Sequence, residues 1–488
     1  MSTDVGNTRN TSEDTSLGRY FAERASDGLS GVYHLHDPVL ALQVRLGLAL
    51  KAAKTLDLQY YLWKGDLSGT LLLHRALEAA DRGVKVRLLI DDIYHSGRDE
   101  VYAALDAHPN FNVRVFNPLR RRHQIGRNLH IVINKGKLNR RMHNKIFLVD
   151  GAVAILGGRN IGDDYFLLDP ELSFRDLDVL AAGQAADDAG SAYDLYWNSD
   201  LSVPISEIRR KSSGTEQLDR LRERLNSWTS ESDSVIHATP STVEEAQVLL
   251  GELRDALVWA PAQIIVDPIE RFKAAGESAF VDLGKQFIDR IESEIVLQSA
   301  YLIPTRGGME ALRAIVDRGV RVRMLTNSMM SNNHISVHAH YAKYRRRLLK
   351  AGVELYEYRS DAALRSFLRA ERGELSCAHA GLHTKAAVAD RRTTIIGSYN
   401  LDPRSRNINS EIGLLIESEE FAARVLAGMK QDFDPKNSYR LYLDEHSIIR
   451  WEGANDSGLR VHFTEPDASI WRRSLAALIR LIPVEDDL

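Results

Sequence analysis

The chain has 488 residues, and its 63 lysines and arginines against 67 aspartates and glutamates leave a formal net charge of −4. With 44% hydrophobic and 27% charged residues, the composition excludes a fully disordered chain, and the near-neutral balance argues against a dedicated nucleic-acid binder. The single cysteine, Cys377, excludes an intrachain disulfide framework and favours a reducing compartment. No stretch reaches the ~18 uninterrupted apolar residues of a membrane-spanning helix.

The first seventeen residues are rich in Ser, Thr, Asn and Asp and lack the basic and apolar segments of a signal peptide, which predicts a disordered tail. Beyond it, strand-like apolar runs alternate with segments of helical spacing. That alternation predicts an α/β fold with mixed or parallel sheets. The expected order is a disordered tail (residues 1–17), a first unit (18–201), a helical connecting segment (202–275), a second unit (276–434) and a C-terminal tail with an amphipathic helix (435–488).

The two units are related by an internal repeat. Residues 79–89, AADRGVKVRLL, are matched by residues 315–325, IVDRGVRVRML, at an offset of 236. The strand-like runs upstream of them, residues 56–61 and 295–300, match as well. One ancestral unit therefore occurs twice, and we expect a pseudo-twofold axis to relate the copies.

A second and more specific repeat carries chemically active residues. Each unit contains the pattern H-x-K-x₄-D, which continues after six residues into a short loop, GGRN at residues 157–160 and GSYN at residues 397–400. Two matches with the same continuation are not expected by chance. The residues of the two patterns are His143, Lys145 and Asp150 in the first unit, and His383, Lys385 and Asp390 in the second.

The spacing of this pattern predicts which side chains meet. Residues two apart in a strand share a face, so the histidine and lysine of each copy project together. The aspartate lies seven residues from the histidine, on the opposite side, so we assign Asp150 and Asp390 a structural role at a hairpin turn. Folding back at that turn brings Gly158 and Asn160 alongside His143.

Two histidines and two lysines without a carboxylate cluster make a poor divalent-cation site, because lysine repels a metal ion. They favour a phosphate group instead, with the ammonium groups neutralising its oxygens. Asn160, Asn400 and Ser398 are the expected polar donors to the substrate, beside Gly158. One imidazole can attack phosphorus while the other protonates the leaving oxygen, a reaction that requires neither metal nor cofactor.

These residues, with the paired H-x-K-x₄-D-x₆-G-[GS]-x-N pattern, resemble the phospholipase D superfamily. Residues 157–166, 174–179, 400–405 and 409–413 look most like bacterial cardiolipin synthases of the C type. The resemblance implies a duplicated phospholipase D-like α/β/α sandwich with one shared site and a phosphohistidine intermediate. In that family phosphatidylglycerol donates the phosphatidyl group, and phosphatidylethanolamine or a second phosphatidylglycerol supplies the alcohol. A phospholipase D that makes phosphatidic acid is the nearest alternative, and a phosphodiesterase or nuclease is the third.

The resemblance also assigns individual roles. It places an acidic residue behind each histidine, matched by Asp176 after His143 and by Glu411 after His383, with Asp178 as a competing candidate. A carboxylate on one ring nitrogen orients the other nitrogen and stabilises the imidazolium. By analogy, His143 is the nucleophile, and His383 is the general acid and later the base.

The same resemblance implies where the enzyme works and with which partners. We expect a cytoplasmic protein that associates peripherally with the inner membrane. Its expected partners are phospholipid substrates and an anionic membrane surface. No nucleic acid is expected, and the sequence does not identify a small helper protein.

Other features have two interpretations. Eight basic residues and no acidic one lie between Leu119 and Arg141, which favours contact with an anionic membrane over a solvated face. The apolar face of residues 470–482, with Trp471, Leu475, Leu478 and Ile482, fits a membrane interface or a packed helix equally. Tyr60, Tyr61 and Trp63 fit the lining of an acyl or headgroup groove, but packing in the core is favoured. His334, His338 and His340 have the spacing of a metal cluster, but no cysteine or acidic ligand accompanies them, which favours a position on the surface.

Overall fold

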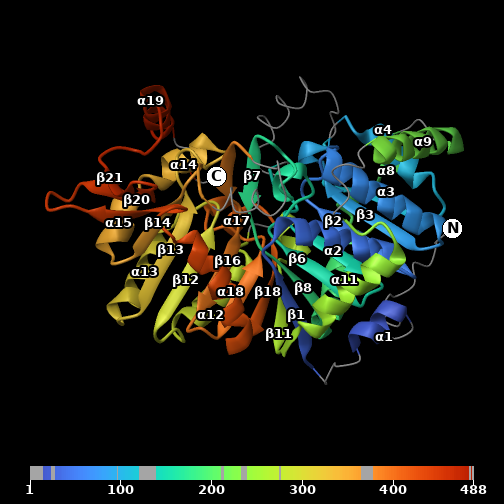
Figure 1. The fold of residues 1–488 in the computed structure, drawn as a ribbon, viewed down its shortest axis with the longest axis horizontal. Coiled ribbons are helices and arrows are strands. Elements are labelled where there is room, and N and C mark those ends of the chain that lie inside the picture. Colours follow the sequence, from blue (N-terminus) through green and yellow to red (C-terminus); the bar gives the residue numbers. More distant parts are fainter. Residues whose placement is uncertain are drawn as a thin grey trace.

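The structure is a computed structural model, and its described residues form two large β-sheets with helices against their faces. Figure 1 shows the first unit on the right, from blue to green, and the second on the left, from yellow to red. No helix in the described part of the chain is both long and apolar enough to cross a membrane. The described residues are 15–22, 28–95, 97–119, 139–209, 214–231, 239–273, 276–363, 377–482 and 485.

The first sheet has nine strands among the described residues, in the order β10-β1-β8-β6-β5-β2-β3-β4-β9. Strands β2, β3 and β4 run parallel, and the other neighbours pair antiparallel. The strands are β1 (Ser30–Leu35), β2 (Thr55–Tyr60), β3 (Lys85–Asp91), β4 (Phe111–Phe116), β5 (Ile146–Val149), β6 (Val153–Gly157), β8 (Asp178–Gly183), β9 (Ser202–Pro204) and β10 (Val258–Ala260).

The second sheet repeats this topology, which confirms the duplication. Its order over the described residues is β11-β18-β17-β16-β12-β13-β14-β19-β20-β21, so that β18-β17-β16-β12-β13-β14 corresponds to β8-β6-β5-β2-β3-β4. Strands β12, β13 and β14 are again the parallel ones. The strands are β11 (Ala262–Val266), β12 (Glu294–Ser299), β13 (Arg321–Asn327), β14 (Glu354–Tyr358), β16 (Lys385–Ala389), β17 (Thr393–Gly397), β18 (Ile412–Glu417), β19 (Ser438–Leu443), β20 (Ile449–Asn455) and β21 (Gly458–His462).

Helices α2 (Pro38–Lys51) and α3 (Leu67–Asp81) belong to the outer layer of the first unit, and α12 (Ala279–Ile288) and α13 (Arg306–Asp317) to that of the second. Helices α3 and α13 both end before glycines with positive φ, Gly83 and Gly319, as the repeat predicts. The remaining helices are α1 (Ser16–Ala22), α4 (Asp99–Asp106), α8 (Ile205–Ile208), α9 (Thr215–Glu231), α11 (Val243–Asp255), α14 (Ile335–Tyr341), α15 (Arg345–Lys350) and α17 (Pro403–Asn407), with 3₁₀ turns at Asp92–Tyr94, Asp163–Tyr165 and Ile269–Phe272.

The inner layer joins the two units. Helix α7 (Gln184–Trp197) packs on β5, β6 and β8 and also on β11 of the second sheet, while α18 (Glu419–Asp432) packs on β16 and β17 and also on β1 of the first. One buried apolar cluster includes Leu148 and Leu156 from the first unit and Val388 and Ile396 from the second. The two units therefore share a continuous core, and their relative position is fixed by apolar burial.

A three-residue turn after β5 and after β16 orients the strands that carry the histidine motifs. Asp150 has φ +54° and its carboxylate accepts the backbone N–H groups of Lys54 and Thr55 at 2.7 and 2.9 Å. Asp390 has φ +49° and accepts the N–H groups of Ser293 and Glu294 in the same way. Both carboxylates therefore tie a hairpin to the neighbouring strand, which is a structural role.

The connecting segment, predicted as helical, differs from the prediction. It contains α8, α9 and α11, but β9 and β10 also extend the first sheet, and β11 pairs antiparallel with β18 of the second. Only Pro261 separates β10 from β11, so the chain passes there from one sheet to the other. Hydrogen-bonding groups at two open sheet edges favour strand over helix at this point.

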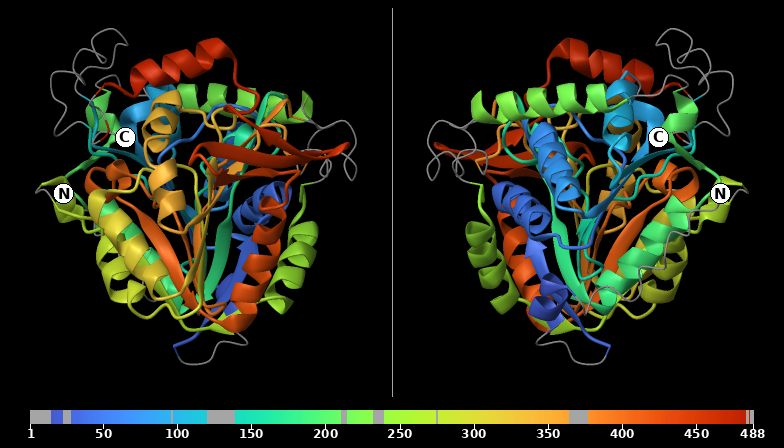
Figure 2. Two further views of the ribbon diagram at one scale, coloured as in Figure 1. Left: turned by 90° about the vertical axis from the view of Figure 1, so that its left-hand side faces the viewer. Right: turned by 90° about the vertical axis from the view of Figure 1, so that its right-hand side faces the viewer.

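The terminal segments also differ from the prediction. Residues 1–14 of the predicted tail lie outside the described residues, but Leu17 belongs to α1 and is buried in the core of the first unit. In the C-terminal segment, β19 pairs with β14, and β20 and β21 continue the second sheet, so residues 438–462 belong to the second unit. Helix α19 (Ile470–Ile479) follows and lies along the top of the molecule in both views of Figure 2.

Candidate active site

The two motif histidines lie just before the corresponding strands β5 and β16, where segments of both units meet. The backbone N–H of His143 donates to the Ser410 carbonyl at 2.9 Å, and that of His383 donates to the Arg175 carbonyl at 2.7 Å. Each histidine therefore has its backbone bonded to the opposite unit. Both side chains are more than nine-tenths buried.

Each histidine is bonded to the acidic residue of the other unit. His143 Nδ1 lies 2.8 Å from Glu411 Oε2, and His383 Nδ1 lies 2.6 Å from Asp176 Oδ2. The prediction that each acid serves the histidine of its own unit is wrong. The ionised carboxylate of Asp176 only accepts hydrogen bonds, so His383 Nδ1 carries the proton and its Nε2 presents a lone pair. Glu411 orients His143 in the same way in its ionised form.

The exchange of acids follows from backbone register. Strand β7 (Leu172–Arg175) pairs parallel with β15 (His379–Leu382), so that Arg175 lies beside the residue before His383 and Asp176 comes next. In the other half, the bridge between Met142 and Ser410 sets His143 beside Glu411 in the same way. Sequence separation alone cannot reveal this pairing, because it is made between the units.

Asp178, the competing candidate, does not contact either histidine. Its carboxylate lies 2.8 Å from Arg45 Nη2 and 3.2 Å from Arg159 Nη1, and all three side chains are buried. This cluster is a buried ion network behind the site. Asp176 is therefore the acid of the first unit.

Gly158 and Ser398 occupy equivalent positions behind the acids rather than on the substrate side. A Cβ at Gly158 would lie 2.2 Å from Asp176 Oδ1, so the glycine makes room for that carboxylate. The Ser398 hydroxyl donates to Glu411 Oε2. The prediction that these two residues bind substrate is corrected accordingly: they hold the acids in place.

The two lysines converge on the same region as the histidines. Lys145 Nζ donates to the His143 carbonyl at 2.6 Å, and Lys385 Nζ donates to the His383 carbonyl. Burial is the main cause that lowers the pKa of Lys145 well below its usual value and that of Lys385 to about 8. Two desolvated ammonium groups side by side are stabilised by an anion, which is the physical requirement for binding a phosphate.

Both imidazoles are neutral at neutral pH. Burial, followed by the positive charges of Lys145 and Lys385, lowers the pKa of His143 well below its usual value. Burial and Lys385 lower the pKa of His383 to about 3. A neutral imidazole with its Nδ1–H fixed is the form that can act as a nucleophile or base through Nε2.

The two acids differ in their ionisation. Burial opposes ionisation of Asp176, but its bond to His383 outweighs burial and lowers the pKa of the carboxyl to about 2. Burial raises the pKa of Glu411 to about 7. The fully ionised Asp176 stabilises a protonated His383 more strongly than Glu411 stabilises a protonated His143.

The asparagines of the motif lie at the site without touching the histidines. Asn160 Nδ2 donates to the Tyr165 hydroxyl at 2.9 Å, and its Oδ1 accepts the N–H of Leu62. The Oδ1 atom of Asn400 is buried and has no hydrogen-bond partner among the described residues. An orphaned polar atom of this kind is satisfied when a ligand or water enters the site.

Aromatic rings line the histidines, and the sequence prediction missed Tyr165 and Phe174 as residues of the site. Tyr61, expected in the core, lies edge-on to His143 with ring centroids 4.9 Å apart. The ring centroids of Tyr165 and Phe174 lie 5.1 and 5.4 Å from that of His383. Both could have been found from their positions in the sequence. Phe174 stands two residues before Asp176, and Tyr165 follows shortly after the GGRN loop.

A comparison with known protein families gives a match on both units. Residues 48–188 and 285–433, more than half of the chain, match the family described as cardiolipin synthase, PLD-like domain. The chain belongs to this cardiolipin synthase family. The resemblance drawn from the two histidine motifs is thereby confirmed.

Relatives within the family match most of the chain. The chain is 37% identical over 466 residues to cardiolipin synthase C of Escherichia coli (strain K12), with 94% of this chain and 96% of that protein covered. It is 24% identical over 408 residues to the major cardiolipin synthase ClsA of Bacillus subtilis (strain 168), covering 82% and 68%. The crystal structure of phosphatidylserine synthase from Haemophilus influenzae Rd KW20 has the same fold, with a TM-score of 0.60, 13% identity, and 96% and 99% coverage.

The basic segment before the first histidine of this family member lies mostly outside the described residues, and its membrane contact stays a prediction. Of the residues that are described, Arg140 donates to the Arg271 carbonyl at 2.8 Å. Arg141 is buried and lies 3.5 Å from Asp91. The basic residues outside the description are Arg120, Arg121, Arg122, Arg127, Lys135 and Lys137.

The three histidines of residues 334–340 do not form a cluster. His338 and His340 are buried in α14, so the prediction of a surface position is wrong for both. His338 Nε2 lies 3.0 Å from Arg345 Nη2, and His340 Nδ1 lies 2.9 Å from the Ser336 carbonyl. The part of the chain that the structure describes contains no group of three His, Cys, Asp or Glu that could hold a metal ion.

Proposed function

We propose that the protein is a cardiolipin synthase that transfers a phosphatidyl group from phosphatidylglycerol or phosphatidylethanolamine to the terminal glycerol hydroxyl of a second phosphatidylglycerol. The expectation that phosphatidylethanolamine supplies the alcohol is corrected here, because its head group ends in an amine and it can act only as the donor. The observation that carries this proposal is the pair of buried, neutral imidazoles, each oriented by a carboxylate from the opposite unit and accompanied by a lysine. Family membership with cardiolipin synthases supports the lipid substrate.

In the first step, Nε2 of His143 attacks phosphorus, and the bond from phosphorus to the glycerol head group breaks as the phosphorus–nitrogen bond forms. His383 delivers the proton that the leaving glycerol oxygen needs, and Asp176 stabilises its imidazolium form. The bound phosphate supplies the negative charge that raises the imidazole pKa within the complex. Lys145 and Lys385 neutralise the non-bridging oxygens of the phosphate.

In the second step, neutral His383 removes the proton from the acceptor hydroxyl, which attacks the phosphohistidine. The phosphorus–nitrogen bond breaks and His143 returns to its neutral form, so the cycle closes without a net proton change. We expect the amide N–H groups of Asn160 and Asn400 to donate to phosphate oxygens when substrate binds. Water in the acceptor position would give phosphatidic acid instead of cardiolipin.

One product assay tests this proposal. The purified protein is incubated in the presence of EDTA with labelled phosphatidylglycerol, with and without phosphatidylethanolamine, and His143→Ala prepared identically serves as the control. We expect labelled cardiolipin, a free glycerol or ethanolamine coproduct according to the donor, and no product from the variant. Phosphatidic acid as the main product would identify a hydrolase, and no product from either mixture would contradict the proposal.

We further propose that the enzyme is cytoplasmic and associates peripherally with the inner membrane through α19. One side of this helix packs on α14 through Ala476, and Arg472 donates to the Met329 carbonyl at 3.1 Å. The opposite side exposes large apolar side chains next to arginines, the composition of a helix that lies in a membrane interface. The exposed residues are Ile470, Trp471, Leu475, Leu478 and Leu481.

Replacing Trp471 and Leu478 with glutamate is expected to weaken binding to vesicles of phosphatidylglycerol and phosphatidylethanolamine by about 100-fold. Burying each of these side chains in the membrane contributes at least ~1.5 kcal/mol to the binding free energy, and ~1.4 kcal/mol corresponds to a tenfold change in affinity. Sedimentation with the vesicles measures the change, and Leu459→Glu, which changes an equally exposed apolar side chain on β21 outside this helix, is the control. Unchanged binding of the double variant would show that α19 is not the contact.

A further inference from the structure

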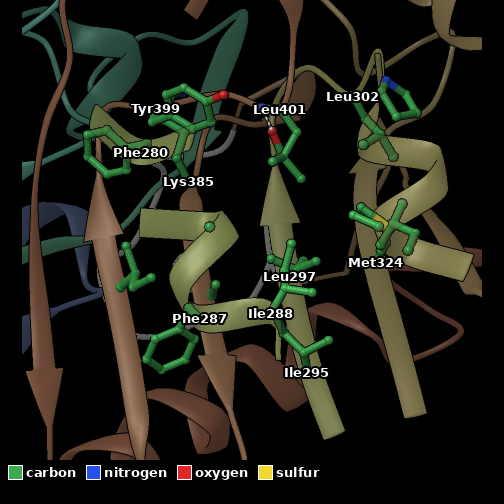
Figure 3. A pocket seen from close by; sticks show the side chains of 18 of the residues that line it. Phe280, Phe287, Ile288, Ile295, Leu297, Leu302, Met324, Lys385, Tyr399 and Leu401 are labelled. Carbon is green, nitrogen blue, oxygen red and sulfur yellow. Dashed lines mark hydrogen bonds between the residues drawn. The ribbon is translucent and has the colours of Figure 1, made fainter. Parts of the chain in front are cut away.

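The second unit contains an apolar cavity of about 270 Å³ between its outer helices α12 and α13 and its sheet. The strands beneath it are β12, β16 and β17, and its walls are mainly aliphatic and aromatic side chains. Figure 3 shows Lys385 and Tyr399 near one end and Phe287 and Ile295 near the other. The wall residues that matter here are Phe280, Phe287, Ile295, Leu297, Ala387 and Ile395.

The cavity leads to the site that holds the phosphate. Lys385 and Ala387 lie two residues apart on β16 and both line it, so the lysine and the cavity share one face of the sheet. Ser299 pairs with Lys385 at one end of β12, and Ile295 pairs with Ala389 at the other. The cavity therefore runs along about 13 Å of strand, at ~3.3 Å per residue, away from the catalytic lysine.

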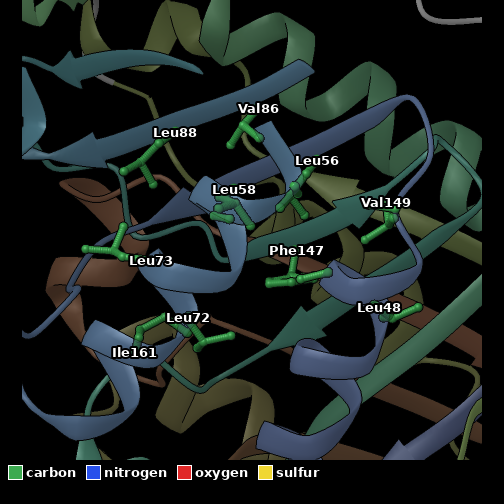
Figure 4. Packing of buried hydrophobic residues seen from close by; sticks show 14 of the residues in the cluster. Leu48, Leu56, Leu58, Leu72, Leu73, Val86, Leu88, Phe147, Val149 and Ile161 are labelled. Carbon is green, nitrogen blue, oxygen red and sulfur yellow. The ribbon is translucent and has the colours of Figure 1, made fainter. Parts of the chain in front are cut away.

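In the first unit the same space is filled. Leu58 pairs with Phe147 on the corresponding strands, and both are buried. In the second unit Leu297 pairs with Ala387, which stands four residues after its histidine as Phe147 does. Figure 4 shows Phe147 packed among Leu48, Leu56, Leu58 and Leu72.

A second position shows the same change of size. Leu72 of α3 corresponds to Gly308 of α13 by the offset of 236 that relates the ends of these helices, and Gly308 lines the cavity. A Cβ at Gly308 would meet other atoms only at 3.5 Å or more, so a larger side chain would fit. Two large side chains of the first unit are thus absent from the second.

The outer helices α2 and α12, which cover the two sheets, differ in how many of their residues are buried. Helix α2 buries eleven of its 14 residues, whereas none of the ten residues of α12 is fully buried. The side chains that α12 turns toward the cavity, Phe280, Leu283 and Phe287, are only partly covered. The fold does not require this hollow, because the first unit closes it with ordinary packing.

We propose that this cavity binds one acyl chain of the phospholipid whose phosphate lies between the two lysines. The proposal rests on the proposed function, because it takes its occupant from the lipid substrate. A linear hydrocarbon chain matches the apolar walls, and the charged opening at Lys385 matches the phosphate that such a chain carries at its end. In the first unit the buried side chains of Phe147 and Leu72 occupy the equivalent positions, so the two sides of the shared site hold the lipid unequally.

The test uses phosphatidylglycerol with a photoreactive diazirine at the end of one acyl chain, bound to the full-length protein carrying His143→Ala. Crosslinking needs no turnover, so its result is independent of whether the enzyme makes cardiolipin. We expect labelled peptides from α12, α13 and β12. Ala387→Phe and Gly308→Leu, which restore the side chains of the first unit, should lower labelling by about fivefold or more.

Ala314→Leu on the exposed part of α13 is the matched control and should label as the parent protein does. A diazirine-bearing free fatty acid of the same length distinguishes the two sources of a hydrocarbon chain. Labelling by the phospholipid elsewhere in the chain, equal labelling in both cavity variants, or labelling by the fatty acid that excess phosphatidylglycerol does not reduce would overturn the proposal. Circular dichroism of both variants identifies any that is unfolded, and the proposal is then decided by the other variant.

Discussion

Replacing His143 with alanine is expected to lower kcat by a factor on the order of 10⁴ to 10⁶, because in the proposed reaction the covalent bond to phosphorus forms on this histidine. The variant should keep its fold, since the backbone N–H of His143 and its bond to Ser410 remain. Mass spectrometry of the acid-labile adduct after mixing with phosphatidylglycerol checks the result: the parent protein carries a phosphatidyl group and the variant carries none.

His383→Ala is expected to show a loss of similar size in overall turnover, because the two units share one site. The activity of the two variants should depend differently on how easily the leaving group departs. His383 delivers the proton to the leaving group, whereas His143 forms the bond to phosphorus. Full phosphatidyl transfer by His383→Ala, with none by His143→Ala, would exclude a shared site. An adduct found on His383 in the parent protein would reverse the two roles.

The second large effect on kcat is expected from the two acids, because each acid bonds the histidine of the other unit. Asp176→Asn is expected to lower kcat for phosphatidylglycerol by about 10² to 10⁴, the range seen when a carboxylate that orients a catalytic histidine becomes an amide. The physical reason is that His383, and not His143, loses the acceptor for its Nδ1–H. Glu411→Gln should lower kcat through His143 instead.

A substrate with an activated leaving group separates these two effects. A phosphatidyl ester of p-nitrophenol departs without a proton donor, so the burst of p-nitrophenol should recover by roughly 10²-fold or more in Asp176→Asn and His383→Ala. It should stay absent in His143→Ala and should not recover in Glu411→Gln, in which His143 remains poorly oriented. If Asp176→Asn instead behaved like His143→Ala, each acid would serve its own unit, against the geometry described above.

The parts of the fold that depend on local spacing could be predicted from the sequence. The strand–helix alternation, the glycines that end α3 and α13, and the duplicated H-x-K-x₄-D pattern all depend on residues within one turn or one hairpin. Asp150 and Asp390 could be assigned to the turns for the same reason. A pattern that occurs twice, with chemically active residues in both copies, also predicts a shared site.

The parts that depend on contacts between distant segments could not be predicted. The pairing of His143 with Glu411 is set by the register between Met142 and Ser410, which are 268 residues apart along the chain. The edge strands β10, β11 and β19 to β21 look like connecting segments until the sheets that they join are known. The cavity of the second unit depends on Ala387 and Gly308, two small residues that are unremarkable by themselves.

The crossed hydrogen bonds have a consequence for the origin of the chain. A single unit with this geometry has a histidine and an acid that cannot reach each other, so it could have worked only as a twofold-symmetric homodimer in which each copy completed the other. Fusion of two genes in tandem would have preserved that dimer within one polypeptide. The two halves could then acquire different residues at equivalent positions. The glycine and serine behind the acids, and the filled and hollow outer layers, are differences between the units that only a fused chain, and not a homodimer, can carry.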